Sequence, residues 1–184
     1  MRRWSVVAPL IFAALLMLHP MGDSFYEIAS ESNTSWLIVH VGALVLFPAM
    51  AAVVWQLLRG VDGRAATLSR AALLTFAVFY TGWEVMTGIA TGVLAQAGDV
   101  EGVERITTHW LSGELGVLNS IGALAWTGAI AAAVFALKRE GASRGTLIAL
   151  GVSAALVMHI PPIGPIALIC LSTAAVNVRR ASRR

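Results

Sequence analysis

The chain has 184 residues, of which 58% are hydrophobic and only 12% are charged, and its formal net charge is +3. A soluble domain usually carries roughly a quarter charged residues, so this composition indicates a single integral membrane domain spanning residues 1–184. The basic excess does not indicate nucleic-acid binding, because the basic residues lie near the ends of apolar segments, where they orient membrane proteins.

The apolar segments predict an all-α fold, a transmembrane bundle of six helices. The first helix, residues 4–19, has the basic start and short apolar core of a signal peptide, but no convincing cleavage site follows it. An uncleaved first helix and a removed signal therefore both stay open. The other helices are expected at residues 36–58, 68–97, 111–137, 146–159 and 163–178.

The last apolar run, residues 146–178, contains the sequence HIPPIGP near its middle. As one helix it would be roughly 50 Å long, well beyond a hydrocarbon core of roughly 30 Å. Prolines remove backbone donors and disfavour helical conformation in the preceding residue. The run therefore predicts two short helices joined by a proline-rich outer turn, and a five-helix chain with one kinked last span is the alternative.

The charge distribution favours six helices with both termini in the cytoplasm. This arrangement places acidic loops outside, and every basic residue except Arg105 inside, as the positive-inside rule requires. The inner basic residues are Arg2, Arg3, Arg59, Arg64, Arg70, Lys138, Arg139, Arg144, Arg179, Arg180, Arg183 and Arg184. The predicted location is the cell membrane, with lipids as partners and a homo-oligomer or a larger membrane complex as further options.

Four ionisable residues share a layer in this topology. Counted from the inner charges at the helical rise, His19, His40 and His159 lie roughly 22–28 Å above the inner boundary, and Glu84 lies at roughly 21 Å. An ionisable side chain at that depth is expected to face the bundle interior. We therefore expect one polar site in the outer half of the bilayer, with His109, Glu114 and Asn119 as additional candidates.

Each of these residues also has a structural interpretation. A histidine at the end of a helix can satisfy free carbonyl groups, and Glu84 could simply hydrogen-bond Tyr80, a threonine or a neighbouring helix. The glycines around Gly88 and Gly92 favour close helix packing, with space for a flat cofactor as the alternative. Trp4, Trp36 and Trp110 are expected in the interfacial belt.

Imidazoles from different helices at one depth predict a bound metal ion or haem, with Glu84 as a ligand or a partner of a ligand. An enzymatic version would use a metal-bound water with Glu84 or Glu114 as base. The sequence contains no compact catalytic or metal motif, so it does not assign catalysis or a substrate. A small-solute or proton transporter and a non-catalytic subunit of a larger complex are the alternative functions.

Overall fold

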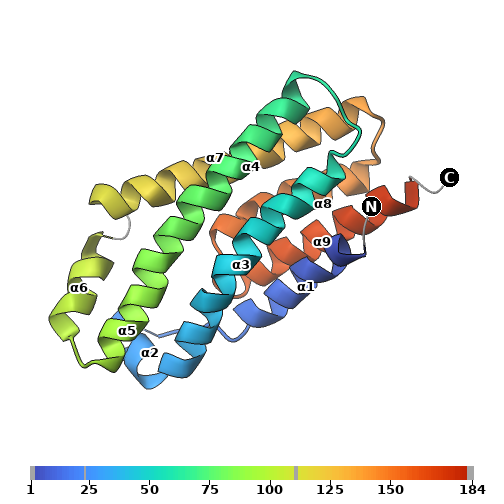
Figure 1. Cartoon of the computed structure of the whole chain (residues 1–184). Coiled ribbons are helices and arrows are strands. Elements are labelled where there is room, and N and C mark those ends of the chain that lie inside the picture. The colour runs from blue at the N-terminus through green and yellow to red at the C-terminus, as the bar shows by residue number, and fades with distance from the viewer. Residues whose placement is uncertain (1–2, 23, 110–111, 182–184) are drawn as a thin grey trace.

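The computed structural model describes residues 3–22, 24–109 and 112–181, and in these residues it contains helices and no strand (Figure 1). The predicted all-α fold is confirmed. A π-helical turn, η1 (Val85–Ile89), joins α4 to α5, and a 3₁₀ segment, η2 (Ser153–Val157), follows α8. The α-helices are α1 (Trp4–Leu16), α2 (Phe25–Glu31), α3 (Asn33–Leu57), α4 (Arg64–Glu84), α5 (Ala90–Gln96), α6 (Val100–His109), α7 (Gly113–Arg139), α8 (Arg144–Val152) and α9 (Ile163–Ala181).

The long helices run side by side along one axis, and the loops gather at two ends (Figure 1). The α3–α4 loop and the α7–α8 loop lie at the same end as the start of α1 and the end of α9. We call this the basic end, because Arg59, Arg64, Lys138, Arg139, Arg144, Arg179 and Arg180 lie there. The opposite end carries α2 and α6, and we call it the acidic end, for Glu27, Glu31, Asp99, Glu101 and Glu104.

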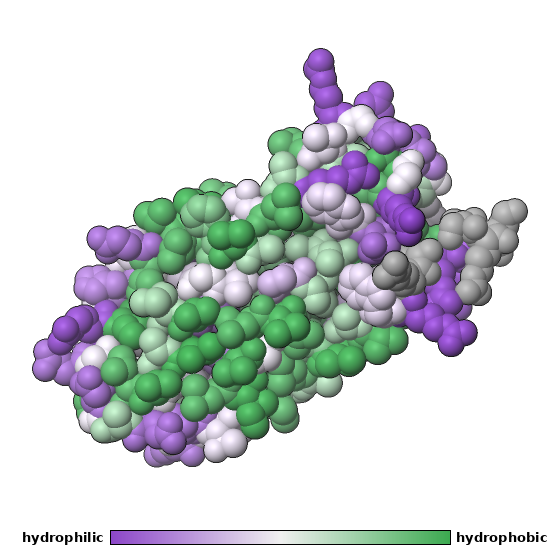
Figure 2. Space-filling model, in the orientation of Figure 1, coloured by the Kyte–Doolittle hydropathy of each residue, from purple (hydrophilic) through white to green (hydrophobic). Residues whose placement is uncertain are grey.

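Large hydrophobic side chains cover the outside of the bundle between its two ends. Val45, Leu124 and Ile148, on three different helices, are 71%, 73% and 67% exposed. Figure 2 shows a hydrophobic band with hydrophilic residues gathered at both ends. In the described part of the chain, Asn33–Leu57, Arg64–Gln96 and Gly113–Arg139 are long and apolar enough to cross a membrane, whereas α1 and Arg144–Val157 are shorter apolar helices.

Two predicted helices end earlier than expected, and each leaves a histidine outside the helix. The helix predicted over 4–19 stops at Leu16, because Pro20 disfavours helical conformation at His19. The helix predicted over 146–159 begins at Arg144 and becomes 3₁₀ at Ser153, and it ends before the proline turn. His19 and His159 therefore lie in loops.

Helices α2 and α6 were not predicted, because both are short and polar. The side chain of Ser24 caps α2 by accepting a hydrogen bond from the backbone nitrogen of Glu27, and Ser-x-x-Glu is a recognised helix start. Gly98, with φ of 75°, ends α5 and lets the chain turn into α6. Both helices pack across the acidic end and bury Ala29 and Val103 together with Trp36.

Fully buried aromatic rings hold the bundle together. Phe47 on α3 packs edge-on against Phe12 and Tyr80, and Phe76 packs against Trp126 on α7. Close approach of the helices also depends on glycine: a Cβ on Gly122 would lie 2.8 Å from the backbone nitrogen of Tyr80. This fits the predicted role of the small residues in packing.

Some predicted features lie outside the described residues. These are the inner residues Arg2, Arg183 and Arg184, the interfacial Trp110, and Leu111, the first residue of the helix predicted over 111–137.

Candidate metal site

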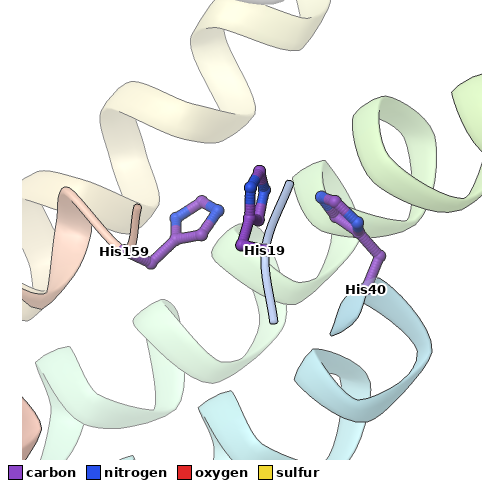
Figure 3. A group of neighbouring side chains, drawn as sticks. All are labelled: His19, His40 and His159. Atoms are coloured by element: carbon purple, nitrogen blue, oxygen red, sulfur yellow. The ribbon is translucent and has the colours of Figure 1, made fainter. Parts of the chain in front are cut away.

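Three histidine side chains converge inside the bundle. His40 comes from α3, whereas His19 and His159 come from the loops after α1 and η2. One ring nitrogen from each lies within 4.8 Å of the other two. Figure 3 shows the ring of His19 between those of His159 and His40. His40 and His159 are buried and His19 is half-buried, so the cluster is largely shielded from solvent.

Backbone carbonyl groups set the orientation of two of the rings. The Nδ1 atom of His40 lies 2.7 Å from the carbonyl oxygen of Trp36, and that of His19 lies 2.8 Å from the carbonyl oxygen of Pro20. A carbonyl oxygen only accepts, so each Nδ1 must carry the proton. The lone pair of each neutral ring is then on Nε2, the arrangement common in metal-binding histidines.

The hydroxyl group of Tyr80 sets the orientation of the third ring, that of His159. Its hydroxyl donates to the carbonyl oxygen of Val157 at 2.8 Å, and it lies 3.1 Å from Nδ1 of His159. The hydroxyl proton is used on the carbonyl, so the oxygen accepts from Nδ1–H of His159. All three imidazoles therefore have Nε2 available as a metal ligand.

The carboxylate of Glu84 meets this cluster from α4. Its Oε1 lies 3.2 Å from Nε2 of His159, and its Oε2 lies 3.9 Å from Nε2 of His40. The side chain is 1% exposed, and Oε1 has no hydrogen-bond partner among the described residues. A buried carboxylate is strongly unfavourable unless a positive group or donor compensates it. A metal cation beside the three histidines would provide that compensation.

The spacing of these atoms fits one small metal ion after modest adjustment. Ligand bonds of about 2.0–2.1 Å in a tetrahedron place neighbouring ligand atoms about 3.3 Å apart. The Nε2 atom of His159 and the Oε1 atom of Glu84, 3.2 Å apart, already have nearly this spacing. The histidine nitrogens span up to 4.8 Å, so at least one ring must move inward on binding.

A π-helical turn shapes the wall from which Glu84 projects. Glu84 is the last residue of α4, and η1 begins at Val85. Such turns leave backbone groups free for other partners, and the carbonyl oxygen of Gly88 accepts a hydrogen bond from the indole nitrogen of Trp36 at 2.7 Å. The same indole stacks on His40, with ring centroids 4.4 Å apart. Trp36 therefore contacts both His40 and η1 and holds them in position relative to each other.

The backbone of His159 packs closely against the start of α9. Gly164 lies so near the backbone of His159 that a Cβ there would collide with its carbonyl group, so glycine permits α9 to start directly beside the site. Both loops lie outside the candidate membrane spans, and burial lowers the pKa of His19 and of His159. Neutral rings are the form that binds metal.

The structure brings together four of the predicted site residues: His19, His40, Glu84 and His159. It leaves the three additional candidates elsewhere. His109 is exposed at the end of α6, Glu114 is exposed in the first turn of α7, and Asn119 lies one turn further along. None of the three lines the cavity beside the cluster.

Two residues at the site have roles that the sequence did not predict. Trp36 was expected in the interfacial belt, but it is 3% exposed and supports His40. Tyr80 was one of the hydrogen-bond partners considered for Glu84 in its structural interpretation, and in the structure its hydroxyl bonds His159. The sequence did contain a signal for Trp36: it lies four residues before His40, and residues four apart share a helix face.

The arrangement can hold a metal ion but does not support haem. The cavity beside the histidines has a volume of about 240 Å³, below the roughly 300–1,000 Å³ of pockets for drug-sized ligands. Haem is a flat macrocycle held by axial ligands on its two faces, whereas here one nitrogen from each of three rings lies within 4.8 Å of the other two. Comparison of the chain with protein-family models, curated proteins and solved structures finds no match.

Substitution of Gly88 tests whether the helix contact positions His40. A Cβ on Gly88 would collide with the His40 ring, whereas a Cβ on Gly82 in the same helical segment meets open space. If the cluster holds a metal ion, Gly88→Ala should weaken its binding by about 10- to 100-fold, the usual effect of disturbing a ligand's support. Zinc titration of the purified protein measures this. Gly82→Ala is the matched control, and equal affinities for the two variants would contradict the assigned contact.

Proposed function

We propose that this chain is an integral membrane protein that binds one divalent transition-metal ion through His19, His40 and His159, with Glu84 as the fourth ligand. The observation that carries the proposal is the convergence of three rings whose Nδ1 atoms are all engaged elsewhere, beside an uncompensated buried carboxylate oxygen. Three imidazoles and a carboxylate in a tetrahedral arrangement suit Zn²⁺ best.

The membrane setting is supported by the surface of the bundle. A band of exposed hydrophobic side chains encloses the helices, and such an extended apolar surface is unfavourable in water (Figure 2). The basic and acidic ends differ in charge as the two sides of a membrane protein do. The basic end then faces the cytoplasm, and the metal site lies toward the opposite side of the membrane.

Metal analysis of the protein purified in mild detergent tests the metal proposal. We expect one zinc ion per chain and a dissociation constant at least ~100-fold weaker after alanine replacement of His19, His40 or His159, because even supporting residues account for 10- to 100-fold. Glu84→Gln removes the charge at nearly constant shape and should also weaken binding.

His109→Ala is the matched control for these variants, because His109 is exposed and remote from the cluster. Its zinc affinity should equal that of the unchanged protein. Retention of full zinc affinity by His40→Ala and His159→Ala would contradict the proposed ligand set.

Cysteine labelling in intact cells tests the orientation. The native Cys170 is first replaced by serine, and a single cysteine is then introduced at Glu101 or at Glu140, exposed residues at opposite ends. A membrane-impermeant maleimide should label the cysteine at position 101 directly and the one at position 140 only after permeabilisation. Direct labelling at position 140 would overturn the proposed orientation.

A further inference from the structure

A cavity lies against the histidine cluster on its side nearest α2 and α6. His19, His40, Glu84 and His159 form one wall of this cavity. Phe25 and Ile28 of α2 and Thr107 of α6 belong to other walls. A purely structural metal site is closed by its four ligands, whereas a site that acts on another molecule borders a space for it.

The cavity reaches the molecular surface. Met21 and Ile160 line it, and these side chains are 62% and 42% exposed. A molecule can therefore reach the cluster without the helices separating. These two side chains belong to the loop that carries His19 and to the loop that carries His159.

The lining defines the chemistry of an occupant. Most of the wall away from the cluster is apolar, formed by residues such as Phe25, Ile28 and Ile160. The polar exceptions there include Thr87 and Thr107, whose hydroxyls donate to the backbone carbonyls of Trp83 and Val103 at 2.9 Å. Their oxygens are then left to accept a hydrogen bond from a ligand.

We propose that the cavity binds a small aliphatic molecule that places an anionic oxygen on the metal and an N–H or O–H group on a threonine oxygen. This inference rests on the proposed metal site. Zinc accepts such a molecule by expanding from four to five ligands. The volume of about 240 Å³ limits the occupant to molecules smaller than drug-sized ligands.

Cobalt-loaded protein provides the test, because Co²⁺ bound by these ligands has a visible spectrum that changes when a further ligand coordinates. Acetohydroxamate is the probe, since it combines metal-binding oxygens, a short alkyl group and one N–H. Azide is the second probe, because it binds metals but is too small to need the whole cavity. Both should change the spectrum of the unchanged protein.

Two tryptophan variants of α6 locate the bound hydroxamate. Thr107 lines the cavity, whereas the adjacent Thr108 is exposed and does not. Thr107→Trp should fill the cavity and weaken acetohydroxamate binding at least about tenfold, while Thr108→Trp leaves it unchanged. Both variants should retain one cobalt per chain and the response to azide, which shows that the metal site is intact.

The outcomes separate this inference from the metal proposal. Stoichiometric cobalt without any spectral response to acetohydroxamate overturns the inference and leaves the metal site standing. Equal acetohydroxamate affinities for Thr107→Trp and Thr108→Trp overturn the placement in this cavity. Failure of the unchanged protein to retain cobalt overturns the proposed function itself, and the inference with it.

Discussion

The buried carboxylate of Glu84 is the constraint on which the rest of the site depends. A carboxylate that is 1% exposed needs a positive partner or hydrogen-bond donors, and among the described residues its Oε1 has no hydrogen bond. Imidazole nitrogens of His159 and His40 lie 3.2 and 3.9 Å from its two oxygens. Neutral imidazoles that carry their protons on Nδ1 present lone pairs to the carboxylate rather than donors. These lone pairs and the carboxylate oxygens repel one another, but all of them can coordinate a cation placed between them.

The surrounding structure maintains this arrangement through contacts that reach well beyond the four side chains. Tyr80 connects His159 to the aromatic core through Phe47 and Phe76. Trp36 connects His40 to the π-helical turn that follows Glu84. Contacts of this kind fix the orientation of the His40 and His159 rings, which is how supporting residues raise metal affinity.

Much of the bundle and of the cluster could be predicted from the sequence. The lengths of the apolar segments predicted the long helices. Counting residues from the basic ends of the helices placed His19, His40, Glu84 and His159 at one depth. This succeeded because helical rise converts sequence separation into height. Contact between the rings did not follow from depth, since helices at one depth can be arranged in several orders.

Other features depend on tertiary contacts that leave little trace in a single sequence. The π-helical turn after Glu84 is stabilised by Trp36 from another helix, so its own residues do not specify it. The short helices α2 and α6 are polar outside the few side chains they bury, and hydropathy alone assigns them to loops. His109 and Glu114 carry the right chemistry but lie on exposed faces.

X-ray absorption spectroscopy of the zinc-loaded protein is the sharpest test of the metal site, because it reports the atoms bound to the metal. The proposed ligand set predicts four light-atom ligands at about 2.0–2.1 Å, with outer-shell scattering from three imidazole rings that falls to two in His40→Ala. A zinc shell of oxygen atoms without imidazole scattering would contradict it, as would a spectrum that His40→Ala leaves unchanged.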